Sequence, residues 1–402
     1  MNKIRYVKLC IALMAMLLLL TSCWNRRELN DMSIASALGF DKKGDGYEVA
    51  VQIINAGEIA SGKGGGGQRM PVVTQQLIGG HTIFESVRAM TTMTPRKIYA
   101  SHIRVLVIGE QLAKEGIADV LDFLSRDHEF RTDFYILVAK GATAADVLQV
   151  LTPLEKIPSN KLFEALETSE QNWGVTSTVD LHELIFDIVS KGKEPALTSI
   201  QIVGNAGTAK TKKNLETLTP AAFQRFNGLA VFRQDKLVGY LSTKESKGYS
   251  YVLGHVKNTV VRASCPDGGD IAIELNRIKP KVRGSVSGGQ PAVEVAVKLE
   301  GNVGEVVCGI DLEKTDSIAW LEEAVNEEVR GTIEASVKKA KAFRSDIFGF
   351  GNAVHRADSR AWRELQKDWE DEFPDLKVDV TVETELRRTG TVVQSFIKEL
   401  KD

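Results

Sequence analysis

Ile103-Arg-Val-Leu-Val-Ile108 is a nearly continuous apolar run, which is typical of a strand covered on both faces. Residues 112–125, which follow it, have helical apolar spacing, and residues 134–139 repeat the buried-strand pattern. A further helix is predicted before the run, over residues 81–93. Because helices and strands alternate here, the order predicts an α/β region in which helices cover a mixed sheet.

The flanking residues extend this region in both directions. Residues 34–40 and 47–54 predict two strands around a turn, and a glycine-rich loop follows at 61–67. Residues 142–192 are predicted to be mainly helical. The polar, weakly patterned segment 204–219 is the predicted main domain boundary.

Beyond this segment the pattern changes to a block of strands and then a block of helices. Long helices are predicted over residues 316–342 and 354–370, each with an apolar stripe at steps of three and four. The predicted strands lie at 228–232, 237–241, 259–265, 271–278, 282–286, 293–300 and 376–382. Such segregation is typical of an α+β domain with an antiparallel sheet.

The N-terminus has the pattern of a bacterial lipoprotein signal. Three basic residues within the first eight precede an apolar core too short for a comfortable membrane span, and Leu20-Thr-Ser-Cys23 follows. This tetrad resembles a lipobox, in which the cysteine thiol takes a diacylglyceryl group and becomes the first mature residue. Two acyl chains would then anchor the protein firmly. The alternative is an ordinary signal peptide with a chance cysteine at position 23.

These patterns together predict an α+β (mixed α/β) multidomain chain. Residues 1–22 are the predicted lipoprotein signal peptide, and residues 23–210 an N-terminal mixed-sheet region with two subdomains. Residues 211–402 are predicted to form a C-terminal antiparallel-sheet domain with two long helices.

Charge and cysteine content narrow the classes of function. Three of the 51 basic residues lie in the removed segment, which leaves 48 against 53 acidic residues and a mature charge of −5. This balance argues against nucleic acid as a partner. No Cys-x-x-Cys occurs, so a zinc or redox site of that kind is not expected. Cys265 and Cys308 are predicted to be unpaired small hydrophobes, with a disulfide as the alternative.

Two motifs imitate known sites without completing them. Gly57-Glu-Ile-Ala-Ser-Gly62-Lys63 matches a phosphate loop, but Gly64 replaces the hydroxyl that would hold magnesium. His182-Glu183 begins like a zinc-protease helix, but Phe186 stands where the second histidine should be. Asp127-His128-Glu129 is charged and compact, although a capping or ion-pair role is expected for it. No catalytic residue, metal site or cofactor is predicted.

Two further segments combine charged, aromatic or glycine residues more closely than folding alone requires. In Trp24-Asn-Arg-Arg-Glu-Leu-Asn30, the paired arginines could contact phosphate headgroups, or Trp24 and Leu29 could dock onto the first domain. Asp346-Ile-Phe-Gly-Phe-Gly351 combines glycines with large apolar side chains, and core packing of a turn is expected there rather than a partner contact.

These segments resemble the Ger(x)C lipoproteins, the C subunits of spore germinant receptors. The resemblance rests on short motifs in family order: Cys23-Trp-Asn-Arg-Arg-Glu-Leu-Asn30, Ser101-His-Ile-Arg-Val-Leu-Val-Ile-Gly109, Asp122-Phe-Leu-Ser-Arg-Asp127, Arg131, Asp346-Ile-Phe-Gly-Phe-Gly351, Trp362, Trp369 and Arg387-Arg-Thr-Gly390. Asn25 departs from the family, which usually has Asp there. Lipidation should not be affected, because it depends on residues up to the cysteine.

The resemblance implies a role in nutrient-triggered germination of endospores. Family members sit on the outer face of the inner spore membrane beside two membrane subunits, A and B. They have no known catalysis, and their fold is three packed domains. The sequence therefore predicts a lipid-anchored, non-enzymatic receptor subunit that acts through protein contacts. An extracytoplasmic solute-binding lipoprotein of a transporter is the alternative, and a secreted hydrolase is less favoured.

Overall fold

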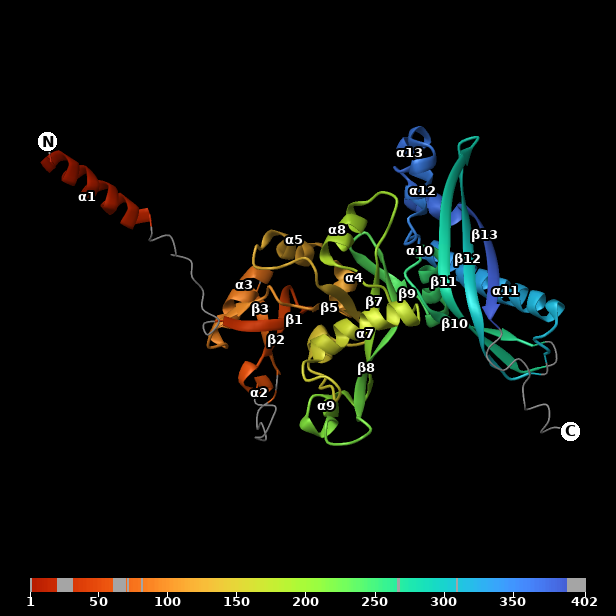
Figure 1. Cartoon of the computed structure of the whole chain (residues 1–402), viewed down its shortest axis with the longest axis horizontal. Coiled ribbons are helices and arrows are strands. Elements are labelled where there is room, and N and C mark those ends of the chain that lie inside the picture. The colour runs from red at the N-terminus through yellow and green to blue at the C-terminus, as the bar shows by residue number, and fades with distance from the viewer. Residues whose placement is uncertain are drawn as a thin grey trace.

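A computed structural model gives the arrangement of the chain (Figure 1). It describes residues 2–19, 32–60, 70, 72–80, 82–265, 268–308 and 310–388. Cys23 and the glycine-rich segment 61–67 lie outside these residues. Helix α1 (Asn2–Leu19) lies apart from the folded body at one end of the molecule. Among the described helices, none has the length and apolarity needed to cross a membrane.

In the described part of the chain, the larger of two sheets has nine strands, in the order β3-β2-β1-β5-β6-β7-β8-β9, with β4 paired to β1. The strands β1, β5, β6 and β7 are parallel neighbours, and the outer pairs are antiparallel. Their bounds are β1 (Met32–Lys43), β2 (Gly46–Ile54), β3 (Val72–Gly80), β4 (Lys97–Tyr99), β5 (Val105–Gly109), β6 (Tyr135–Ala139), β7 (Ala196–Gly204), β8 (Ala222–Arg233) and β9 (Lys236–Tyr240). The predicted mixed sheet is confirmed.

Helices cover both faces of this sheet, as the apolar run at β5 predicts. Leu106 and Ile108 pack on one face with the helices α3 (Ile83–Ala89), α4 (Glu110–Glu115), α5 (Ala118–Arg126) and α8 (Leu181–Val189). Val105 and Val107 pack on the other with α6 (Ala144–Leu148) and α7 (Pro158–Asn172). All four side chains are fully buried. The short helices α2 (Ala56–Ala60) and α9 (Ala206–Ala209) lie at the periphery (Figure 1).

The smaller sheet has four strands in the order β10-β11-β12-β13. They are β10 (Thr259–Ser264), β11 (Asp270–Ser287), β12 (Gln290–Val306) and β13 (Lys377–Arg388). The 28-residue helix α11 (Thr315–Ala342) packs on this sheet through its predicted apolar stripe, because Leu321, Val325 and Val329 are buried there. Beside it lies α10 (Thr243–Leu253), and α12 (Phe350–Ala357), α13 (Ser359–Leu365) and α14 (Trp369–Glu372) follow.

The α+β multidomain fold class is confirmed, while four details differ from the prediction. The two strands expected at 271–278 and 282–286 are one strand, β11. The second long helix is three short ones, α12 to α14. The last strand pair, β12 and β13, is parallel rather than antiparallel. The helix α10 was not predicted.

The expectation that Cys265 and Cys308 are unpaired is wrong, because the structure joins them in a disulfide. The physical reason is the sheet register. Strand β11 pairs with both β10 and β12, and its first residues face the end of each neighbour. The two cysteines, 43 residues apart in sequence, are thereby brought to a Cα–Cα distance of 6.5 Å, which a disulfide spans without backbone movement.

The segment 204–219 separates β7 from β8, yet both strands belong to the larger sheet. The change of sheet comes after Tyr240, where β9 ends. The two sheets also share one core, since Leu229 and Val231 of β8 pack in the same cluster as the α11 stripe. The division of the chain into domains at 210/211 stays a prediction.

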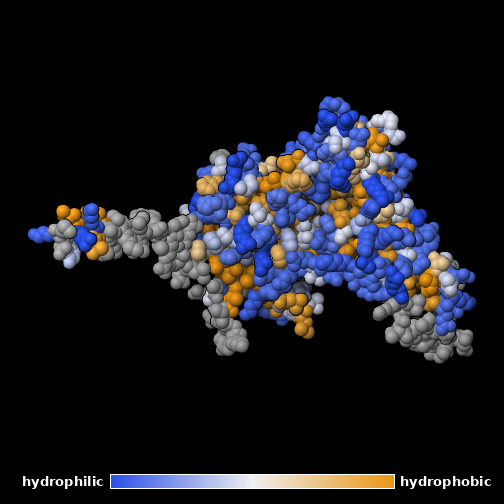
Figure 2. All heavy atoms as spheres, turned by 45° about the horizontal axis from the view of Figure 1, so that its top comes forward, coloured by the Kyte–Doolittle hydropathy of each residue, from blue (hydrophilic) through white to orange (hydrophobic). Residues whose placement is uncertain are grey.

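One face of the molecule is shown by hydropathy in Figure 2. It is mostly hydrophilic, and its hydrophobic atoms lie in separate patches. A single broad apolar surface, as a permanent large interface would need, is not seen on this face. Contacts made through it would therefore depend on local sites.

Candidate interaction sites

The described residues contain no cluster of three or more His, Cys, Asp or Glu side chains that could hold a metal ion. His182 is exposed on α8, and Phe186, also exposed, stands where the second histidine ligand would be. Gly57 lies in the short helix α2, and the phosphate-loop-like motif then continues into residues outside the description. Neither imitation of a known site is completed in the described part of the chain.

Among the described residues, Ser177, His255 and Glu170 partly resemble a catalytic arrangement. Ser177 Oγ lies 3.4 Å from His255 Nδ1, and a Glu170 carboxylate oxygen lies 3.6 Å from the same nitrogen. A catalytic relay needs the nucleophile and the carboxylate on opposite ring nitrogens. Burial, with a smaller contribution from the nearby Lys193 charge, lowers the pKa of His255 to about 4. The cluster is a buried polar contact, since Ser177 is fully buried as well.

Asp127-His128-Glu129 has the structural role predicted for it. Glu129 forms an ion pair with Lys97, its backbone N–H donates to Asp127 Oδ1 at 2.9 Å, and its carbonyl accepts from Ser101 Oγ at 2.6 Å. The His128 side chain is largely exposed. These contacts attach the end of α5 to the segment around β4.

The turn Asp346–Gly351 holds a buried carboxylate with several hydrogen bonds near the contact of the two sheets. The buried Asp346 carboxylate accepts hydrogen bonds from the N–H of Phe350 at 3.0 Å, the N–H of Gly351 at 2.7 Å, and Trp369 Nε1 at 3.0 Å. Burial raises its pKa from 3.8 to about 6, while the N–H donors of Gly351 and Phe350 oppose this shift. Gly349 has a φ of +71°, which lets the turn enter α12.

This turn forms a joint between the two sheets. The N–H of Glu194 donates to the Asp346 carbonyl at 2.9 Å, and the N–H of Asn352 donates to the Gly192 carbonyl at 3.2 Å. A methyl group at Gly351 would lie only 2.7 Å from Gly192 Cα, so the two backbones touch. Core packing of this turn is confirmed, because its apolar side chains Ile347, Phe348 and Phe350 are buried.

Charged groups surround the joint. Glu194 accepts from the N–H of Gln234 at 2.6 Å, and burial raises the pKa of its carboxyl to about 7. Arg233 of β8 forms an ion pair of 2.9 Å with Glu370 of α14. These contacts fix the orientation of the smaller sheet relative to the larger one, since they bond backbone and side chains of both.

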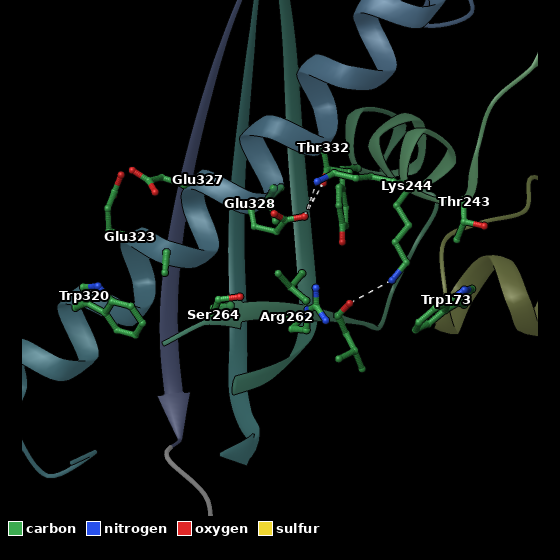
Figure 3. A pocket seen from close by; sticks show the side chains of 17 residues that line it. Trp173, Thr243, Lys244, Arg262, Ser264, Trp320, Glu323, Glu327, Glu328 and Thr332 are labelled. Carbon is green, nitrogen blue, oxygen red and sulfur yellow. Dashed lines mark hydrogen bonds and ion pairs between the residues drawn. The ribbon is translucent and has the colours of Figure 1, made fainter. Parts of the chain in front are cut away.

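A second site is a groove of about 990 Å³ beside the edge strand β10 (Figure 3). Strand β10 runs along its floor, α11 forms one wall, and α10 with Trp173 forms the other. Trp173 belongs to the end of α7, so the groove spans from the larger sheet's helices to those of the smaller sheet. Figure 3 shows Trp173 and Trp320 at opposite ends of the opening.

Basic and acidic side chains face each other across this groove. Lys247 Nζ lies 3.5 Å from the centre of the Trp173 ring and donates to the Val260 carbonyl at 3.2 Å. Burial lowers the pKa of Lys247 to about 8. Lys244 pairs with Glu328 at 2.9 Å. The sequence reasoning missed this site, although the Ser-x-x-Glu capping signal at 242–245 could have located its α10 wall.

Comparison with known proteins identifies two family models that match the chain. Residues 25–202 match the family model described as spore germination protein N-terminal domain. Residues 227–390 match the model described as spore germination B3/GerAC like, C-terminal. The chain belongs to the GerAC-like spore germination family. The two matched regions lie on either side of the predicted boundary segment.

Relatives in this family extend over the full chain. Spore germination protein KC of Bacillus subtilis (strain 168) is 31% identical over 405 residues, covering 99% of this chain and 100% of the relative. Spore germination protein B3 of the same organism is 24% identical and covers 94% of this chain and 96% of its own length. A solved structure titled "Crystal Structure of the GerBC protein" matches 90% of this chain and 99% of that chain, with a TM-score of 0.55 and 17% identity. This last match supports the fold alone.

The family motifs fall on different parts of this fold. Asp122 and Arg126 form an exposed ion pair along α5 at 2.8 Å, and Arg131 pairs with Asp133 at 2.7 Å. Trp362 and Trp369 pack against the joint. Cys23, the predicted lipidation site, lies outside the described residues, so its modification stays a prediction.

Proposed function

We propose that this chain is a lipid-anchored, non-enzymatic subunit of a nutrient germinant receptor. Diacylglyceryl and acyl chains on Cys23 would hold it to the outer face of the bacterial cell membrane and, in the spore, of the inner membrane. It would contribute to germination through contacts with the A and B membrane subunits. The observation that carries the proposal is the match of both family models, in order, over nearly the whole chain after residue 24.

The geometry supports a role in contacts rather than in catalysis. Polar groups in the described core, such as Asp346 and Glu194, are bonded to backbone and side chains at the joint. They fix the two sheets in one orientation. Both residues line a cavity of about 580 Å³ at the joint, but their carboxylates accept hydrogen bonds from the backbone there and are held in structural contacts. A protein that transmits or stabilises an assembly needs such a fixed body with separate contact surfaces.

The solute-binding alternative has less support from the fold. A solute-binding lipoprotein would need two similar α/β lobes around a cleft. Here one sheet has nine strands of mixed direction and the other has four, with different connectivity. The two halves therefore do not provide the matched walls of such a cleft.

Replacement of Cys23 tests the anchor. In Cys23→Ala we expect no incorporation of labelled palmitate, less protein in the membrane fraction, and impaired germination, because the acyl acceptor is lost. Cys10→Ala is the matched control, since Cys10 lies within the predicted signal peptide and should change none of these. A Cys23→Ala protein that stays in the membrane fraction of spores that germinate normally would contradict the proposal.

A further inference from the structure

Strand β10 has one edge without a strand partner in the described structure, and this edge faces the groove of Figure 3. The order β10-β11-β12-β13 places β10 at the end of the smaller sheet. Lys247 reaches the Val260 carbonyl from the side opposite β11, so this carbonyl points into the groove. Because alternate residues of a strand point their backbone groups the same way, Arg262 and Ser264 present theirs to the groove as well.

The walls have the features of a site for an extended chain. Trp173, at 46% exposure, and Trp320 offer aromatic surface at the two ends. Glu323 and Glu327 of α11 line the wall between them and are exposed. Glu327 has no ion-pair partner within the part of the chain that the structure describes, so its charge is available to a ligand.

We propose that this groove binds an extended segment of a partner polypeptide that carries a lysine or arginine. The segment adds as a fifth strand beside β10 and places its basic side chain against Glu327, whereas Glu323 already pairs with Arg330 at 3.6 Å. Backbone groups of Arg262 and Ser264 give the pairing its register. Glu327 favours the basic residue, because Lys244 and Arg262, which also line the groove, already pair with Glu328 at 2.9 Å and with Asp270 at 3.6 Å.

The inference rests on the proposed function, because the partner segment is taken to belong to a membrane subunit of the receptor. Lys247 already covers one carbonyl of the edge, which is how many proteins protect an edge strand from indiscriminate pairing. Only the stretch beyond Val260 is open. A short, specific segment fits this arrangement better than a long sheet contact between two copies of the chain.

Cross-linking in native membranes tests the contact directly. The full chain carries the photo-reactive amino acid p-benzoyl-phenylalanine in place of Val260, which is 43% exposed and lines the groove. We expect a cross-link to a Lys- or Arg-bearing extended segment of a receptor membrane subunit, identified by mass spectrometry of the joined peptides. Co-purification of the chain with the membrane subunits is measured on the same samples.

Two pairs of variants separate the contribution of the strand edge from that of the acidic wall. Each is made in the chain that carries p-benzoyl-phenylalanine at position 260. Arg262→Pro removes a backbone N–H from the open edge, while Arg262→Ala keeps it. Glu327→Lys reverses the charge of the wall, and Glu334→Lys makes the same change on an exposed α11 site that does not line the groove. We expect about tenfold lower cross-link yield in Arg262→Pro and in Glu327→Lys, relative to their controls.

The outcomes discriminate among the possible occupants. A cross-link only to a second copy of this chain, or only to its own residues 389–402, would overturn the inference. So would equal yields in each variant and its control. If the chain co-purifies with the membrane subunits but never cross-links to them from position 260, the inference fails while the proposed function stands. If wild type shows neither co-purification nor cross-linking, both fail.

Discussion

Asp346→Asn should change how the stability of this protein depends on pH. In the folded state the carboxyl is buried, and its pKa rises from 3.8 to about 6, chiefly because burial disfavours the charged form. The folded state therefore binds this proton more tightly than the unfolded state does. The group contributes stability that is fully present below about pH 4 and is lost as the pH rises through about 6.

The size of the effect follows from the two pKa values. The interval from 3.8 to about 6 corresponds to about 3 kcal/mol of stability lost between low and neutral pH. About 2 kcal/mol of this falls between pH 4.5 and 7.5. An asparagine can keep its carbonyl oxygen toward Gly351 and Trp369 but turns an amide toward the Phe350 N–H. The loss of the hydrogen bond from the Phe350 N–H does not depend on pH. It therefore lowers the free energy of unfolding of the variant by the same amount at every pH.

The assay is urea unfolding of wild type and Asp346→Asn at several pH values, followed by tryptophan fluorescence and circular dichroism. The difference in free energy of unfolding, wild type minus variant, should fall by about 2 kcal/mol from pH 4.5 to 7.5. Asp358→Asn is the control of opposite sign: the N–H groups of Ala361 and Arg360 lower the pKa of exposed Asp358, so its contribution is lost as the pH falls. If the free energies of unfolding of wild type and Asp346→Asn changed in parallel with pH, the reasoning would be refuted.

Two further predictions concern the disulfide and the joint. Reduction of the Cys265–Cys308 disulfide should lower the stability of the wild type by about 4 kcal/mol, because the bond closes a loop of 43 residues in the unfolded chain. In calorimetry, a Cys265→Ser/Cys308→Ser variant should be insensitive to reductant. Gly351→Ala should destabilise by about 1–3 kcal/mol, because its new methyl group would lie 2.6 Å from Trp362 Cη2. Gly331→Ala, in open space on α11, should instead raise the melting temperature through a gain of about 0.5–1 kcal/mol; equal effects of the two substitutions would contradict the packing argument.

The parts of the fold that the sequence predicts are those with a strong local period. The run at β5 and the stripe of α11 are each long enough for burial on one face, or on both, to leave a clear pattern. The helix α10 has no such stripe, because it lies between the two sheets and buries small polar residues such as Ser246 and Ser250 with its tyrosines. Its cap, Ser242 with Glu245, was the available signal.

Strand β11 shows why a local breaker can mislead. Pro280 lies within it, between the two strands predicted at 271–278 and 282–286. However, β10 pairs only with residues 270–275 of β11, so beyond Leu275 the strand is itself an edge. A proline at an edge position needs no N–H donor on its open side. The strand therefore continues through Pro280 to Ser287. Local sequence does not reveal where a neighbouring strand ends.

The candidate sites were harder to predict for the same reason, since each depends on segments far apart in the chain. The joint brings Gly192 to Gly351, and the groove brings Trp173 to Trp320. The sequence does constrain where they lie relative to the proposed anchor. From Cys23 to Met32 the chain can span at most about 30 Å. Because β1 starts at Met32 and the joint fixes the smaller sheet to the larger one, anchoring at Cys23 would confine the groove to one bounded zone above the membrane. A partner segment that binds there would have to lie within the same zone.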